Sequence, residues 1–88
     1  MDVVYSKRVG RRVRKRKLPA DVWVDFRDAF KSLADTKNFR LFDIKKLTDK
    51  GQYRYYRLRL GRYRALFWIE KETIYVEDIG PRGEIYKP

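Results

Sequence analysis

The sequence contains no cysteine and no histidine, and these absences exclude several ways of stabilising a small protein. Without cysteine there can be no disulfide and no zinc–cysteine site, and without histidine the other usual zinc sites are excluded as well. An apolar core must therefore stabilise the fold. The supply is adequate, because 43% of the residues are hydrophobic and 16% are aromatic, and this composition excludes a disordered basic tail.

Long apolar segments are also missing. No run approaches the roughly 20 residues that span a membrane, and the N-terminal sequence MDVVYSKRVG lacks the apolar stretch of a secretory signal. We therefore expect a cytoplasmic protein with no membrane partner. With 88 residues the chain is long enough for one domain and too short for two, so residues 1–88 are expected to form a single domain.

Acidic residues are scarce in two segments, and these segments carry the positive charge. The net charge is +11, from 23 basic and 12 acidic residues. Residues 7–17 hold eight basic residues and no acid, and residues 50–69 hold six basic residues and no acid, so the remainder is net negative. Single-sign blocks of this kind attract polyanions such as RNA. The high charged fraction, 40%, is typical of proteins from very hot environments.

The apolar pattern of the first half predicts one strand and two helices. Residues 2–6 are predicted to form a strand, after which Ser6 caps a helix over residues 7–17 with a narrow apolar face. Pro19 breaks this helix and suits the first turn of a second one over residues 20–35, where apolar residues recur at helical spacing. Whether the following residues, 36–41, form a loop or a helix end stays open.

The second half alternates with the period of strands. The predicted strands cover residues 41–47, 53–60, 63–69 and 73–79, with turns at residues 48–51, 61–62 and 70–72. The last three strands make an antiparallel meander because their connections are short. We therefore predict an α+β fold of order β-α-α-β-β-β-β, in which two helices pack on one face of a small, mainly antiparallel β-sheet.

Strand alternation assigns three arginines to the face opposite the helices. Successive side chains of a strand point to opposite faces. Arg57, Arg59 and Arg64 share the open face with Leu66, and Tyr55 and Trp68 are nearby. The side chains predicted to face the helices are Tyr56, Leu58, Leu60, Tyr63, Ala65, Phe67 and Ile69. Arginines with no acid between them repel one another, so this face is predicted to bind phosphate beside base-stacking rings. The alternative, which stays open, is that an acid of residues 77–84 (Glu77, Asp78 or Glu84) neutralises the arginines.

Two blocks of sequence resemble one protein family. YYRLRLGRYR at residues 55–64 and GPRGEIY at residues 80–86 are similar to the RelE/ParE toxin superfamily, and to its RelE branch in particular. RelE-like toxins cut messenger RNA on the ribosome without a metal and are silenced by an antitoxin. The resemblance therefore implies the toxin of a type II toxin–antitoxin system, a ribosome-dependent mRNA endonuclease that needs no cofactor. Its partners would be the ribosome, mRNA and a RelB-like antitoxin, which we expect to occlude the arginine face.

The resemblance also implies the catalytic residues. These are Arg57, Arg59, Arg64, Arg82 and Tyr86. Tyr86 would take the proton of the 2′-hydroxyl that attacks the adjacent phosphate, while Arg64 and Arg82 would stabilise the charge on the phosphorane. Arg57 and Arg59 stand where some relatives have lysine. The general acid stays open, because arginine hardly ever loses its proton. Tyr86 could instead be a packed terminal tyrosine.

Other residues are predicted to hold the RNA backbone without reading its sequence. They are Arg11, Arg12, Lys15, Lys46, Arg54, Tyr55 and Arg62. The basic helix over residues 7–17 would contact ribosomal RNA, although it could also be merely solvated or meet an acidic antitoxin segment. Two other functions stay open for the whole chain. They are a non-catalytic, ParE-like poison of DNA gyrase and a plain RNA- or ribosome-binding module.

Overall fold

A computed structural model describes residues 1–47 and 54–84 of the chain. The elements are β1 (Asp2–Tyr5), α1 (Lys7–Arg14), α2 (Ala20–Thr36), the 3-10 helix η1 (Phe39–Leu41), β2 (Asp43–Lys46), β3 (Tyr56–Leu60), β4 (Tyr63–Glu70) and β5 (Thr73–Pro81). This is the predicted order. The turn predicted at residues 48–51, Tyr53 and Tyr86 lie outside the described residues. No helix of the described segments is long and apolar enough to cross a membrane.

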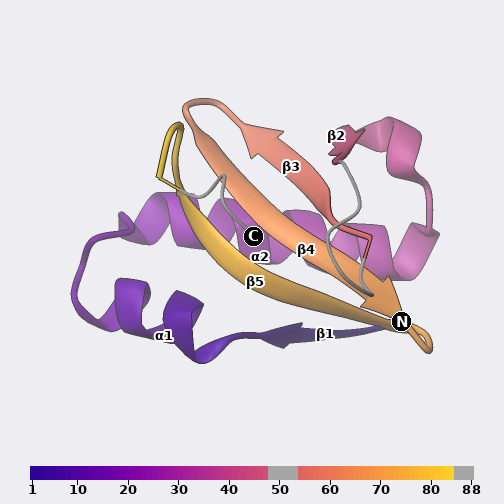
Figure 1. Cartoon of the computed structure of the whole chain (residues 1–88), viewed down its shortest axis with the longest axis horizontal. Coiled ribbons are helices and arrows are strands. Elements are labelled where there is room, and N and C mark those ends of the chain that lie inside the picture. The colour runs from indigo at the N-terminus through magenta and orange to yellow at the C-terminus, as the bar shows by residue number, and fades with distance from the viewer. Residues whose placement is uncertain (48–53, 85–88) are drawn as a thin grey trace.

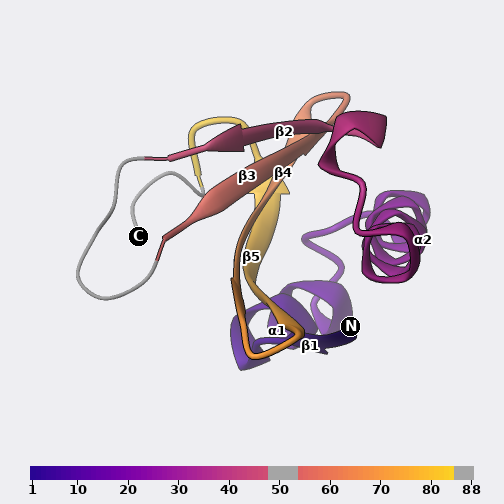
Figure 2. The same ribbon diagram turned by 90° about the vertical axis from the view of Figure 1, so that its right-hand side faces the viewer.

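The strands form one sheet of order β1-β5-β4-β3-β2. β1 pairs with β5 in parallel, and every other pair is antiparallel, so the mainly antiparallel sheet and its meander are confirmed. Helix α2 covers one face of this sheet, whereas α1 lies along the edge of β5, beyond the end of β1 (Figures 1 and 2). The α+β fold is therefore the predicted one, with α1 at the rim of the helical layer.

The core lies between α2 and the inner face of the sheet. Phe26, Phe30 and Leu33 recur at helical spacing on α2 and are fully buried. From the sheet, Leu58 and Phe67 meet them, and the rings of Phe30 and Phe67 pack edge to face with centroids 5.2 Å apart. Burial of such side chains contributes roughly 1.5–3 kcal/mol each. The predicted inner face of β3 and β4 is therefore confirmed.

The first helix and the strand β3 differ most from their predicted bounds. α1 ends at Arg14, three residues before the predicted end, because Arg16 adopts a left-handed conformation with φ of 56° that no helix continues. The turn brings Leu18 into the core, where it is 2% exposed. β3 begins at Tyr56, later than predicted. The segment left open between helix and strand contains the short η1 helix.

Tyr5 makes the stability of the fold depend on pH in the alkaline range. Its ring packs against Trp23 and Phe30, with centroids 4.8 and 6.2 Å apart, and burial raises its pKa to about 12. In the unfolded chain a tyrosine titrates near pH 10. Between these values the unfolded chain loses a proton that the folded chain keeps, so stability falls as the pH rises.

We therefore expect the thermal midpoint of the wild type to fall more steeply than that of Tyr5→Phe between pH 10 and about 12, and the two to run in parallel below pH 10. Circular dichroism melts across this range test the expectation. Every other ionisable group is common to both proteins, so only the difference between the two profiles is informative. Parallel profiles up to pH 12 would show that Tyr5 ionises freely in the folded protein.

Candidate nucleic-acid interface

The hairpin of β3 and β4 brings arginines from distant parts of the chain together. Arg59 and Arg64 are direct cross-strand partners, and Gly80 of β5 lies on the other side of Arg64. Beyond β5, the backbone N–H of Arg82 donates to the carbonyl oxygen of Arg62 at 3.1 Å, which fixes the two residues side by side. Like charges directly opposite one another in a sheet are destabilising, so the arrangement favours binding of an anion.

These arginines surround a pocket of about 380 Å³, which we call the arginine pocket. It is lined by Arg59, Gly61, Arg62, Arg64, Pro81 and Arg82. Gly61 has a φ of +61° and makes the tight turn that sets Arg62 at the rim. Three residues predicted as catalytic and one predicted to bind RNA therefore meet here. A planar guanidinium suits the oxygens of a phosphate because it donates two parallel hydrogen bonds.

Arg64 is the most unusual member of the pocket because it is only 7% exposed. Its Nε is buried without a hydrogen-bond partner, and no acidic side chain of the described residues pairs with it. The prediction of an open face is wrong at Arg64 and at Leu66, which is 3% exposed. Both lie on β4, the central strand of the sheet, which has a paired strand on each side.

Asp43 supplies the acid that sequence reasoning missed. It is the first residue of β2 and the register partner of Arg59. Its carboxylate lies 2.9 Å from Nε of Arg59 and 3.4 Å from a terminal nitrogen of Arg57. The acids proposed as neutralisers were those of residues 77–84, and Asp78 instead contacts Arg8 and Arg12 of α1. No local pattern marks Asp43, since its role depends on the pairing of two strands separated in the chain.

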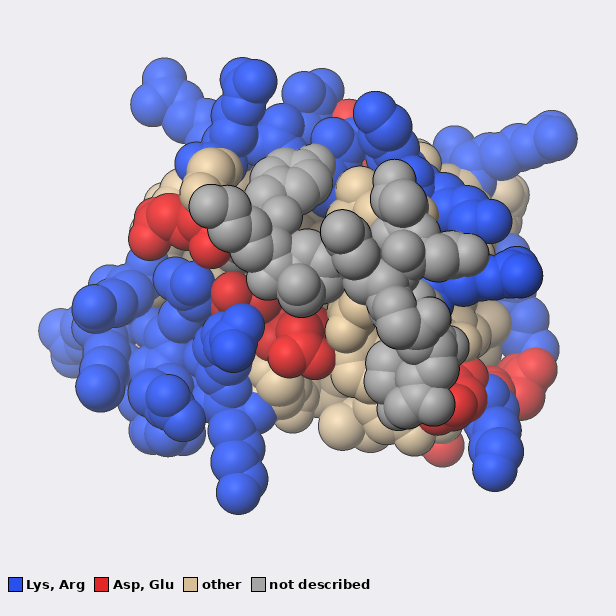
Figure 3. Space-filling view, in the orientation of Figure 1, with Lys and Arg blue, Asp and Glu red and all other residues tan. Residues whose placement is uncertain are grey.

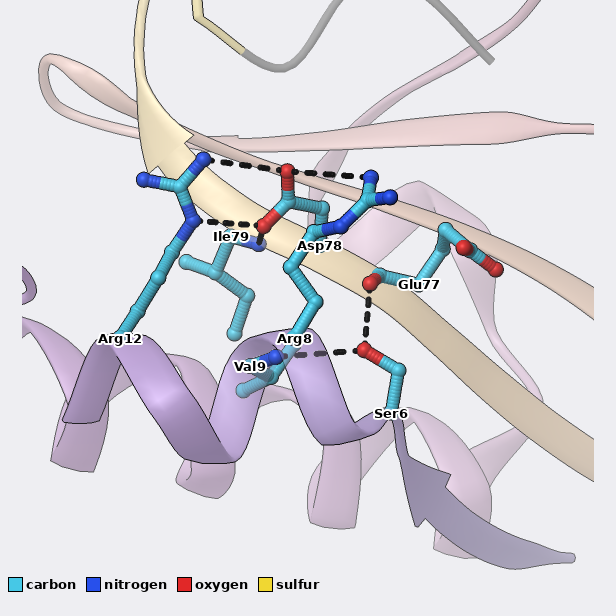
Figure 4. A network of polar contacts seen from close by, with 7 residues as sticks. All are labelled: Ser6, Arg8, Val9, Arg12, Glu77, Asp78 and Ile79. Carbon is cyan, nitrogen blue, oxygen red and sulfur yellow. Dashed lines mark hydrogen bonds and ion pairs between the residues drawn. The ribbon is translucent and has the colours of Figure 1, made fainter. Parts of the chain in front are cut away.

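Asp78 joins the basic helix to the sheet (Figure 4). Its buried carboxylate accepts hydrogen bonds from Nε and a terminal nitrogen of Arg12, at 2.8 and 3.3 Å, and lies 3.9 Å from Arg8. Ser6 caps α1 as predicted, accepting from the N–H of Val9 and donating to the carbonyl oxygen of Glu77. The extra residue at position 77 opposes no residue of β4, which marks a β-bulge.

Comparison with known proteins identifies solved structures of similar fold. No family model and no curated protein matches the chain. The crystal structure of the archaeal RelE–RelB complex from Pyrococcus horikoshii OT3 matches with a TM-score of 0.74 and 28% identity, over 94% of this chain and 96% of that one. This chain has the RelE fold. A RelB–RelE antitoxin–toxin complex from Methanococcus jannaschii matches with a TM-score of 0.73 and 21% identity, over 94% of each chain.

Helix α1 carries a second basic surface. A pocket of about 290 Å³ beside α1 is lined by Arg8, Arg11, Arg12, Lys15, Lys17 and Glu84. It contains the three helix residues predicted to bind RNA, although Arg12 is engaged by Asp78 and its side chain is only 20% exposed. Figure 3 shows basic side chains gathered over α1 and over the β3–β4 turn, with acidic side chains between them.

The remaining predicted residues lie on or next to the RelE-fold sheet, or outside the described segments. Lys46 ends β2, and Tyr55 precedes β3 and meets Trp68 edge to face, with centroids 5.6 Å apart. The ring of Trp68 in turn stacks on the ring of Tyr75, with centroids 5.1 Å apart. Three aromatic rings therefore form a row across the sheet. Arg54 also lies just before β3. The role of Tyr86 stays a prediction.

Proposed function

We propose that this chain is a RelE-like toxin that cuts messenger RNA on the ribosome. The observation that carries the proposal is the arginine pocket, and above all Arg64, a buried guanidinium with no acidic partner among the described residues. A buried charge without a partner is costly, and a phosphate group would provide the missing hydrogen bonds and charge. The RelE fold around this pocket supports a nuclease over a general anion-binding role.

In the proposed reaction, both atoms that form the new bond belong to the RNA itself. The 2′-hydroxyl of one nucleotide loses its proton and attacks the adjacent phosphorus, the bond to the 5′-oxygen of the next nucleotide breaks, and that oxygen takes up a proton. Arg64 and Arg82 bind the phosphorane oxygens, where charge increases most in the transition state. Tyr86 takes the proton from the 2′-hydroxyl. Arg57 and Arg59 hold the flanking backbone.

The proposed partner is a RelB-like antitoxin. The two similar structures are both complexes of RelE with RelB. The positive field of this chain favours an acidic segment of such a partner, because opposite charges accelerate association and fix its orientation. We propose that this segment covers the arginine pocket and thereby excludes RNA. α1, with its own basic pocket, is proposed to hold ribosomal RNA by its phosphates.

Primer extension on mRNA in a translating extract tests the nuclease. We expect cuts within codons that require ribosomes, and a loss of about 10²-fold in Arg82→Ala, since one transition-state donor is removed. Tyr86→Phe is expected to lose most of the activity, because its ring cannot accept the proton. Arg27→Ala is the matched control, since it removes the same charge from an exposed site on α2.

Two results would select another function. Intact message with the wild type, together with ribosome binding, would favour a plain binding module, an alternative to which the neutralisation of Arg57 and Arg59 by Asp43 lends support. Inhibition of DNA gyrase in vitro with no RNA cleavage would favour a ParE-like poison. Equal cutting by the wild type and both site variants would remove these residues from the mechanism.

A further inference from the structure

Asp43 holds an unusual position at the edge of the arginine pocket. One carboxylate contacts two arginines, with one oxygen 2.9 Å from Nε of Arg59 and the other 3.4 Å from a terminal nitrogen of Arg57. Arg57 and Arg59 are two residues apart on β3, so their side chains leave the same face of the strand. β2 places Asp43 directly opposite Arg59, and the fold itself therefore sets the contact.

The atoms used in these contacts leave the phosphate-binding ends of Arg59 available. Asp43 takes Nε, so the two terminal nitrogens of Arg59 remain for the pocket that this residue lines. Arg57 is less accessible than Arg59, since its side chain is only 15% exposed. Arginine side chains are long and lose much rotamer freedom when they bind a ligand. A carboxylate that fixes them beforehand reduces that loss.

The same carboxylate also weakens the attraction of the site for RNA. It removes one unit of positive charge from a surface whose affinity for phosphates depends on its charge. A carboxylate at this position therefore does not help RNA binding. Orienting two guanidiniums, by contrast, requires direct contact with both of them. We infer that Asp43 is a positioning residue, which sets Arg57 and Arg59 to hold the RNA backbone beside the reacting phosphate and lowers RNA affinity in doing so. The inference rests on the proposed nuclease function.

Asp43→Asn separates orientation from affinity, because it keeps the shape of the side chain and removes its charge. We expect binding of a short fluorescein-labelled single-stranded RNA to tighten by about twofold to fivefold, as one repulsive charge is lost. We expect kcat for ribosome-dependent cleavage to fall by about tenfold to 10²-fold, since small misplacements of catalytic groups have effects of this size. For this variant we therefore expect both KM and kcat to fall, whereas a purely structural defect would not lower KM.

Two further variants control the result. Asp43→Glu retains the carboxylate and is expected to recover most of kcat and to restore the weaker RNA binding. Asp25→Asn makes the same charge change at an exposed position of α2, on the other side of the sheet, and is expected to leave kcat unchanged. Melting curves of all four proteins establish that each is folded at the assay temperature.

The outcomes distinguish this inference from the function on which it rests. A wild type that cuts mRNA while Asp43→Asn cuts as fast or faster would overturn the positioning role and leave the nuclease standing, with Asp43 as a simple counter-ion. A wild type that cuts no mRNA would overturn the proposed function, and the positioning role with it. Weaker RNA binding by Asp43→Asn would also contradict the inference.

Discussion

Replacing Arg64 by methionine is expected to remove mRNA cleavage and to make the protein more stable. Arg64 is 7% exposed, and its Nε is buried without a hydrogen-bond partner among the described residues. Leaving a polar group in this state costs about 1–3 kcal/mol, which methionine of similar length avoids. The same change removes a donor to the phosphorane, which is worth about 10²–10³ in rate. The two effects have opposite signs, as expected where a binding site is kept at the expense of stability.

Urea unfolding with and without inorganic phosphate tests the structural half of this expectation. A ligand that binds only the folded state raises its stability, so phosphate should stabilise the wild type and have a smaller effect on Arg64→Met. Arg27→Met, which removes an exposed arginine from α2, controls for net charge and should change stability by less than about 0.5 kcal/mol. A loss of stability in Arg64→Met would identify Arg64 as part of the scaffold, contrary to the proposed role.

Local periodicity was sufficient to predict which side chains form the core and which carry the charge. Leu58 and Phe67 face α2, and Arg57 and Arg59 face away from it, because alternation along a strand depends on the strand alone. The same holds for α2, whose apolar positions repeat at helical spacing. The meeting of Arg59 with Arg64 also followed from sequence, since the tight turn between β3 and β4 fixes the register.

Features that depend on distant pairing could not be predicted in this way. Asp43 meets Arg59 only through the register of β2 and β3, which brings together residues that are far apart in the chain. The burial of Arg64 results from β4 being the central strand, and strand order is a property of the whole sheet. Asp78 was one of three acids left open as neutralisers of the sheet arginines, and it contacts Arg12 because α1 lies along the edge of β5 (Figure 1).

The contact between Asp78 and Arg12 leads to the second large effect, a loss of stability. Asp78→Ala leaves the guanidinium of Arg12 four-fifths buried with no carboxylate, and it removes the oxygen that accepts from the N–H of Ile79 at 2.9 Å. Breaking a buried pair by removing one partner costs about 3–5 kcal/mol. Because Arg12 keeps some access to water, we expect about 3 kcal/mol, a drop of about 15 °C in the thermal midpoint of a domain of this size.

A double variant shows whether this loss comes from the stranded charge or from packing. Replacing both partners, as in Arg12→Met with Asp78→Leu, removes the charge along with its partner, and such replacements are often neutral or stabilising. We therefore expect the double variant to recover most of the stability that Asp78→Ala loses. Asp25→Ala on the exposed face of α2 is the control and should have little effect. A double variant as unstable as Asp78→Ala would mean that α1 is held to β5 by the shape of this contact, and its charge would then be secondary.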